Sequence, residues 1–175
     1  MVSAGMARAA AVVAALLAAH GARAEAPAAV PEVTTASFGD WMVICAGPAT
    51  ERKCEAVLTV RDERGQAAAA IAIGQSAKTA LPHMSLRVAT NAFVAAPAQV
   101  KFGADRPDLP FLLCVPQGCV AEVKLADKAL MARLLAIAAD AGGQLNWRAA
   151  SGQELKFSLS TKGMAAALAQ VGIVP

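Results

Sequence analysis

Residues 38–61 read FGDWMVICAGPATERKCEAVLTVR, and this stretch decides the fold of the chain. Its first part alternates, and the residues on one face are Trp41, Val43 and Cys45. Its last part alternates too, and one face collects Cys54, Ala56, Leu58 and Val60. Gly47-Pro48 between them marks a turn, so the stretch predicts a β-hairpin with strands at residues 38–45 and 54–61. A disulfide between Cys45 and Cys54 would close the base of the hairpin loop.

Short extended segments continue beyond this hairpin. Residues 67–74 read AAAAIAIG, and Ile71 and Ile73 at a spacing of two favour a strand over the helix that alanine prefers. The other expected strands are residues 85–89, 100–102, 109–115, 119–125, 144–149 and 154–160. Many short strands separated by turns predict a mainly β chain, folded as an antiparallel β-sandwich of immunoglobulin-like architecture.

One or two short helices should accompany the sandwich. In residues 127–141, apolar side chains repeat at helical spacing from Leu130 onwards, with Asp127 as the N-cap and Gly142-Gly143 as the stop. A second, shorter amphipathic helix is expected over residues 163–171, at the end of the chain.

The first 24 residues have the three parts of a secretory signal peptide. A positive charge at Arg8 precedes an apolar run at residues 9–19, and Ala22-Arg23-Ala24 forms a small-x-small cleavage site. As a helix, the apolar run would rise about 16 Å, roughly half the thickness of a bilayer core, which argues against a transmembrane anchor. We therefore expect residues 1–24 to be cleaved and the remainder to be exported.

The exported part begins with residues 25–37, which lack periodicity and are expected to form a flexible linker. Residues 38–175 are expected to form a single domain. No later stretch reaches the roughly 18 apolar residues that a spanning helix needs, so the mature chain is expected to be soluble and without a membrane span. The expected location is the periplasm, with outer-membrane association or secretion as alternatives.

The charge pattern limits the partners. The whole chain has a net charge of +3, and loss of Arg8 and Arg23 with the leader lowers it to +1. Lysine and arginine are scattered without a basic run, so neither nucleic acid nor an anionic membrane surface is an expected partner. The expected partner is an envelope or host protein that the sequence does not identify, and the oligomeric state is not predicted.

The four cysteines form two close pairs, Cys45 with Cys54 and Cys114 with Cys119. In an oxidising compartment, such a pattern predicts structural disulfides, the second one across the hairpin turn Pro116-Gln117-Gly118. A redox-active dithiol is an alternative for the second pair, although thioredoxin-like sites have two intervening residues at a helix N-terminus rather than four between strands. A metal site is a further alternative.

Other reactive groups are sparse. His83 is the one histidine outside the leader, and we expect it in a loop. No Gly-x-Ser-x-Gly turn or glycine-rich phosphate loop is present, so no catalytic, cofactor-binding or metal-binding residue is assigned. An acid/base pair could come from Asp105, Asp108, Glu122 or Asp127. Sequence alone does not bring two of these carboxylates to one cleft.

Trp41 and Trp147 are the two largest aromatic residues of the chain. Because large side chains are few in this alanine-rich sequence, we expect both to anchor the core. The competing interpretation is an exposed patch for a partner or ligand, since tryptophan is enriched at binding hot spots.

An ordered set of short motifs resembles the invasion-associated locus B family. The motifs are Phe38-Gly39-Asp40-Trp41, Cys45, Cys54, Pro110-Phe111, Cys114, Pro116-Gln117-Gly118, Cys119, Phe157-Ser158-Leu159 and Lys162-Gly163. The resemblance runs from about residue 38 to the C-terminus. It implies a small exported bacterial protein with a β-sandwich fold and the disulfides Cys45–Cys54 and Cys114–Cys119. It carries no established catalytic residue, and it links some family members in pathogens to host-cell invasion.

The resulting expectation is a non-enzymatic envelope protein that acts through protein or envelope contacts, which in a pathogen would extend to host cells. Two alternatives stay open: a periplasmic thiol–disulfide redox module, and a small-ligand-binding module with Trp41 or Trp147 in its pocket.

Overall fold

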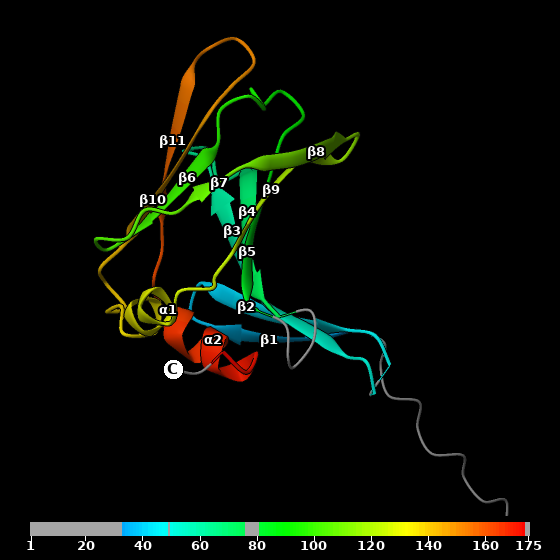
Figure 1. Cartoon of the computed structure of the whole chain (residues 1–175), viewed down its shortest axis with the longest axis vertical. Coiled ribbons are helices and arrows are strands. Elements are labelled where there is room, and N and C mark those ends of the chain that lie inside the picture. Colours follow the sequence, from blue (N-terminus) through cyan, green and yellow to red (C-terminus); the bar gives the residue numbers. More distant parts are fainter. Residues whose placement is uncertain (1–32, 49, 76–80, 174–175) are drawn as a thin grey trace, which may run out of the picture.

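The chain folds into two antiparallel sheets and two helices, as Figure 1 shows for the computed structural model. The structure describes residues 33–48, 50–75 and 81–173, and the predicted leader lies outside these ranges. The strands in these ranges are β1 (Val33–Phe38), β2 (Trp41–Ala46), β3 (Lys53–Arg61), β4 (Ala67–Gly74), β5 (His83–Val88), β6 (Ala98–Phe102), β7 (Asp108–Leu109), β8 (Phe111–Val115), β9 (Gly118–Lys124), β10 (Gly143–Arg148) and β11 (Glu154–Leu159). The helices are α1 (Lys128–Leu135) and α2 (Met164–Gln170). The predicted mainly β sandwich with short helices is confirmed.

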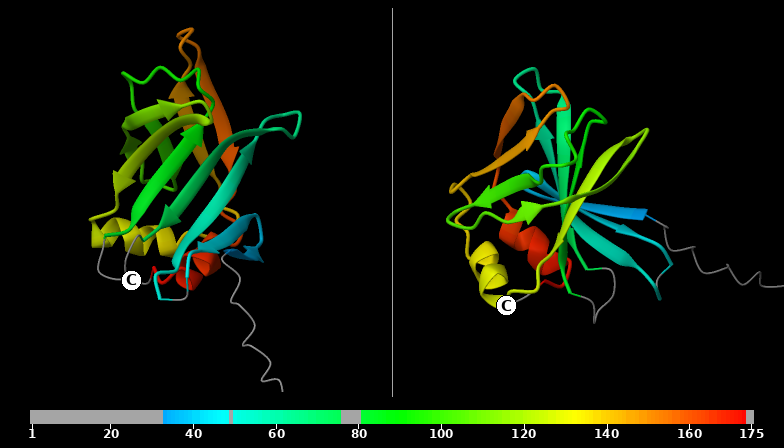
Figure 2. Two further views of the ribbon diagram at one scale, coloured as in Figure 1. Left: turned by 90° about the vertical axis from the view of Figure 1, so that its right-hand side faces the viewer. Right: turned by 45° about the horizontal axis from the view of Figure 1, so that its top comes forward.

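The larger sheet has seven strands in the order β1-β2-β3-β4-β5-β9-β8, and the smaller has four in the order β11-β10-β6-β7. The sheets face each other across one core, and both helices gather at one end of the sandwich (Figure 2). Neither helix in the described ranges is long and apolar enough to cross a membrane.

The first predicted hairpin is confirmed from Trp41 onwards, whereas Phe38 belongs to β1 and residues 39–40 form the turn between β1 and β2. Strands β2 and β3 pair antiparallel, with Trp41 opposite Leu58 and Cys45 opposite Cys54. The faces predicted by alternation are the ones that point inward, and their inward residues Val43, Ala56 and Val60 are buried. Strand β4 has the predicted bounds of residues 67–74.

The core extends over both sheets and both helices. The largest fully buried side chains are Trp41, Phe102, Ile71, Ile73, Met84, Leu86, Leu109, Leu134, Leu145, Met164, Leu168 and Val100. They come from both sheets and both helices, so one continuous apolar interior holds the domain together.

The predicted linker at 25–37 is wrong over its last five residues. Val33–Phe38 forms β1, which pairs along its whole length with β2. The strand gives no periodic signal because it is an edge strand and most of its side chains are exposed on both faces. Backbone pairing with β2 orders it instead. The remainder of the predicted linker, residues 25–32, lies outside the described residues.

The predicted helix at 127–141 is shorter than expected. Asp127 is the N-cap as predicted, but α1 ends at Leu135 and Ala136 caps it. The Oγ1 atom of Thr161, a residue distant in sequence, donates to the carbonyl of Ala138 at 2.9 Å. That hydroxyl also accepts from the N–H of Gly142 at 3.1 Å, so it holds the segment after α1 in a turn.

Two smaller expectations have opposite outcomes. His83 begins β5 rather than lying in a loop. The predicted C-terminal helix is confirmed as α2, with Gly163 and Val171 as its caps.

Candidate functional site

Two motifs that are about 120 residues apart meet in the structure. The N–H of Asp40, in the turn between β1 and β2, donates to the carbonyl of Lys162 at 3.1 Å. The indole Nε1 of Trp41 donates to the carbonyl of Ser160 at 3.0 Å. The Ser160 hydroxyl in turn donates to Oδ2 of Asp40 at 2.6 Å. These contacts, which we call the motif junction, join the start of β2 to the segment between β11 and α2.

Glycine is required at two points of the motif junction. Gly163 has φ +86°, and a Cβ placed there would lie 1.9 Å from the carbonyl oxygen of Phe38. Gly39 has φ +58°, and a Cβ there would lie 2.6 Å from the carbonyl oxygen of Lys162. Both distances are far below van der Waals contact, so the two backbones approach this closely only because side chains are absent. The conspicuous motif residues at this junction therefore hold two parts of the fold together.

The motif junction borders one end of a groove. The groove lies between β11 and the outer face of β2 and β3, and it has a volume of about 500 Å³. Its lining residues are Asp40, Met42, Ile44, Val57, Leu58, Thr59, Val60, Arg61, Ser158 and Ser160. Beyond Arg61 and Ser158 a second hollow of about 770 Å³ continues over the turn at residues 61–64 and along β11. We call the first hollow the β11 groove.

The lining chemistry of the β11 groove is apolar with hydroxyls. Met42 is 41 % exposed, and Ile44 and Val57 are partly exposed on the same face. Thr59 and Ser158 add exposed hydroxyl groups. Strand β11 ends the smaller sheet, so in the described part of the chain no strand is hydrogen-bonded to its outer backbone edge. A groove with an apolar floor and an open strand edge can bind an extended chain.

The polar groups of the β11 groove lack a catalytic arrangement. The Asp40 carboxylate accepts the Ser160 hydroxyl, and no histidine is among the lining residues. At the other end, Nη1 of Arg61 donates to the carbonyl of Gly65 at 2.8 Å. Across the described ranges, no cluster of three or more His, Cys, Asp or Glu side chains is placed to hold a metal.

The cysteines lie on the larger sheet in two disulfides. One joins Cys45 on β2 to Cys54 on β3, and the other joins Cys114 on β8 to Cys119 on β9. Each links residues that are directly opposite in an antiparallel pair of strands. Cys119 is fully buried whereas Cys114 is exposed. Neither pair lies at a helix N-terminus, where thiolates of redox enzymes are stabilised.

Both tryptophans lie in the core and neither lines the β11 groove. Trp41 is 1 % exposed and Trp147 is 3 % exposed. Trp147 stacks on Phe157 with ring centroids 4.9 Å apart and planes 9° from parallel. Its buried Nε1 has no hydrogen-bond acceptor among the described residues, in contrast to the paired Nε1 of Trp41. An exposed tryptophan patch is therefore not present.

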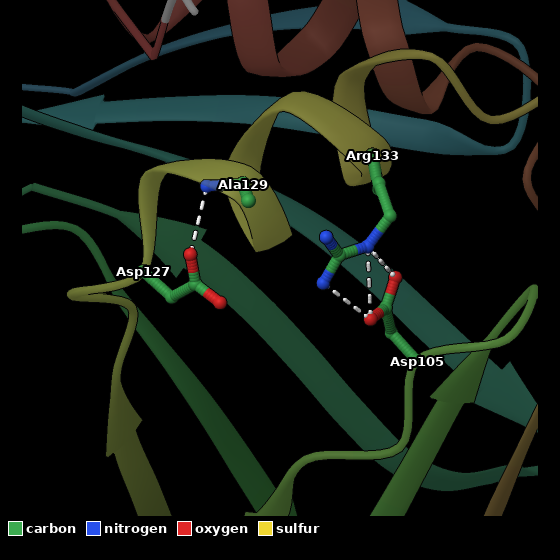
Figure 3. A network of polar contacts seen from close by, with 4 residues as sticks. All are labelled: Asp105, Asp127, Ala129 and Arg133. Carbon is green, nitrogen blue, oxygen red and sulfur yellow. Dashed lines mark hydrogen bonds and ion pairs between the residues drawn. The ribbon is translucent and has the colours of Figure 1, made fainter.

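Three of the carboxylates that could form an acid/base pair, Asp105, Asp108 and Asp127, have separate partners, and Asp105 and Asp127 each contact α1. Asp105 accepts three hydrogen bonds from Arg133, the shortest at 2.8 Å, and so ties the turn after β6 to α1 (Figure 3). Hydrogen bonding to the Arg133 guanidinium lowers the pKa of Asp105 below its ordinary value of 3.8. Asp127 caps α1 by accepting from the N–H of Ala129, and Asp108 accepts from Gln99. These groups stabilise the fold and do not form an acid/base pair.

The β11 groove has no motif in the sequence that marks it as a binding site. Its floor residues Met42, Ile44 and Val57 occupy the face of β2 and β3 that points away from the core, where polar residues are expected. That excess of apolar residues on the outer face could have indicated a binding surface. No pattern among neighbouring residues predicts that Ser158 on β11 lines the same groove.

Comparisons with known proteins agree with the motif pattern. A family model described as "Invasion associated locus B (IalB) protein" matches residues 41–172. A crystal structure of invasion associated protein B from Bartonella henselae superposes with a TM-score of 0.64 at 18 % identity, covering 79 % of this chain and 95 % of that one. At this identity the superposition establishes the fold alone. A comparison with curated proteins gives no match.

Proposed function

The chain belongs to the invasion associated locus B (IalB) family, and from this premise we propose that it is an exported, non-enzymatic envelope protein whose β11 groove binds an extended segment of another protein. The observation that carries this proposal is the combination of an apolar floor on β2 and β3 with an open backbone edge on β11.

Binding in the β11 groove would follow from two complementary interactions. A segment laid along β11 would form main-chain hydrogen bonds with its open edge, as a fifth strand of the smaller sheet. Alternate side chains of that segment would contact Met42, Ile44 and Val57 on the floor. Asp40 at one end and Arg61 at the other would favour a basic and an acidic residue, respectively, in the bound segment.

Two disulfides support export. Disulfides persist in oxidising compartments such as the periplasm, and the expected leader at 1–24 supplies the route. The periplasm is the location we propose, with an envelope protein as the bound partner. In a pathogen, the same groove would be available to a host-cell protein if the chain reached the cell surface.

The absence of a catalytic arrangement in the β11 groove supports a binding role. Groove residues supply one carboxylate and hydroxyl groups but no general base beside a nucleophile. One observation favours a second candidate function, a redox module: Cys114 is exposed and could be attacked by a thiolate. Alkylation of the mildly reduced protein across a pH series tests it, because a redox site requires a thiolate of lowered pKa and an ordinary titration would exclude it.

The groove hypothesis is tested with random peptides displayed on phage and selected against the mature, disulfide-bonded protein. We expect the enriched peptides to alternate apolar residues. Thr59→Arg places a long cation on the groove floor and should weaken their binding at least about tenfold, which is about 1.4 kcal/mol.

Thr90→Arg is the matched control, because Thr90 is also an exposed threonine and lies outside the groove. It should leave the affinity of the enriched peptides unchanged. The proposal is contradicted if the enriched peptides bind Thr59→Arg with the same affinity as the unchanged protein. It is also contradicted if their affinity falls equally for Thr59→Arg and Thr90→Arg.

A further inference from the structure

An apolar strand lies open at one edge of the larger sheet. Strand β8 ends the seven-stranded sheet, at the edge opposite β1, and the β8–β9 hairpin projects from the body of the sandwich (Figure 1). Leu112 is 59 % exposed, Leu113 is 51 % exposed and Val115 is 40 % exposed. Edge strands usually carry charged residues that prevent pairing with another chain, but residues 111–115 contain none.

The backbone of this edge is available for pairing. Cys114 lies directly opposite Cys119 with a Cα–Cα distance of 3.9 Å. In antiparallel pairs, the close Cα spacing belongs to residues that do not exchange hydrogen bonds with each other. The N–H and C=O of Cys114 therefore point away from β9, towards the open edge.

The sequence of β8 is nearly symmetric in chemistry about its centre. Residues 110–116 read Pro-Phe-Leu-Leu-Cys-Val-Pro, with Leu113 in the middle. We infer that β8 pairs antiparallel with β8 of a second copy of this chain, across a two-fold axis at Leu113. The two seven-stranded sheets would then form one continuous sheet in a homodimer.

This register pairs apolar residues at its centre. Leu113 meets its own copy and Leu112 meets Cys114. The β-bulge between Phe111 and Leu113 turns Phe111 towards the core, so the shared ladder is confined to residues 112–114. Pro110 and Pro116, which lack an N–H, lie outside this ladder. Because the strand carries no charge, two identical copies meet without repulsion, as a self-complementary isologous interface requires.

The pairing should be reversible. A β-bulge between Phe111 and Leu113 interrupts the β8–β9 ladder and, with the two prolines, keeps the shared strand short. Such a contact buries less than the roughly 1,200–2,000 Å² of a standard interface. A concentration-dependent equilibrium between monomer and dimer is the expected state. The β11 groove stays open in this dimer, because none of its lining residues lies on β8 or β9.

Sedimentation velocity of the mature, disulfide-bonded protein over a concentration series tests the dimer. The unchanged protein should shift from monomer to dimer, and Leu113→Lys should raise the dimer dissociation constant at least about tenfold by placing two cations face to face. Val33→Lys is the control, because Val33 is 57 % exposed on the opposite edge strand β1. A monomer at every concentration, or equal loss of the dimer in both variants, overturns the inference.

A mixing experiment tests the two-fold register itself. Leu113→Lys and Leu113→Glu should each be monomeric alone, whereas an equimolar mixture should recover the dimer, since residue 113 faces residue 113 only across this axis. A mixture that stays monomeric overturns the register. Far-UV circular dichroism and melting curves should be unchanged in both variants, because the Leu113 side chain is exposed in the monomer.

Discussion

The close approach at the motif junction can be measured with substitutions at two glycines that have nearly the same φ angle. Gly163 has φ +86° and Gly152 has φ +88°. A Cβ at Gly163 would lie 1.9 Å from the oxygen and 2.4 Å from the carbonyl carbon of Phe38, whereas a Cβ at Gly152 would have nothing within 4 Å. Alanine at the two positions therefore shares the backbone strain and differs in the collision.

The free-energy cost of the left-handed backbone, which both variants share, has a known magnitude. A left-handed conformation costs a residue with a Cβ about 1–2 kcal/mol. The loss of chain entropy in the unfolded state partly offsets this cost by about 0.4–1 kcal/mol, equally at both sites. Gly152→Ala should therefore lower the free energy of unfolding by about 1.6 kcal/mol at most.

At Gly163, the collision of the new Cβ with Phe38 adds a second free-energy cost. Relief of a 1.9 Å contact with backbone atoms requires the β1–β2 turn to move away from the segment before α2. The hydrogen bonds from Asp40 to Lys162 and from Trp41 to Ser160 span that gap. At about 0.5–1.5 kcal/mol each, their loss makes Gly163→Ala about 1–3 kcal/mol less stable than Gly152→Ala, before any loss of packing.

Equilibrium urea denaturation of the two oxidised variants, followed by far-UV circular dichroism and tryptophan fluorescence, gives the comparison. Trp41 belongs to the junction, so its emission should also respond to Gly163→Ala. Equal stability of the two variants would refute the reasoning, because it would mean that the two backbones can separate without cost.

Further predictions concern the tryptophans and the ion pair at α1. In the same denaturation assay, Trp41→Phe should lower the free energy of unfolding by about 1–3 kcal/mol more than Trp147→Phe. Loss of the Trp41 indole leaves the carbonyl of Ser160 without its hydrogen-bond donor. The Nε1 of Trp147 has no acceptor in the described residues, so its loss breaks no such bond. Equal costs would contradict this assignment. Because Arg133 lowers the pKa of Asp105, the ionised carboxylate adds stability above its ordinary value of 3.8 and loses it as the pH falls through the lower pKa of the folded state. Asp105→Asn should therefore flatten the decline of the unfolding free energy below about pH 4, and an unchanged slope would show that the pair contributes nothing.

Sequence patterns predicted a strand well where one of its faces is buried and the other is exposed. The β2–β3 hairpin and β4 were predicted because a strand with one buried face alternates every second residue, and that signal is contained in a few neighbouring residues. The edge strand β1 has no buried face to produce the signal, so it was interpreted as linker. The end of α1 was misplaced because the hydroxyl of Thr161, distant in sequence, holds the segment that follows α1.

The sequence by itself determined the mainly β class, the placement of the cysteines at opposed positions of two hairpins, and the family resemblance. Only the tertiary structure decided that the motifs around Trp41 and Gly163 meet at one junction, and that β11 lies beside β2 and β3 to form a groove. The physical reason is the range of the interactions. Alternation and turn chemistry act between near neighbours, whereas the junction and the groove depend on how two sheets stack, which the packing of the whole core determines.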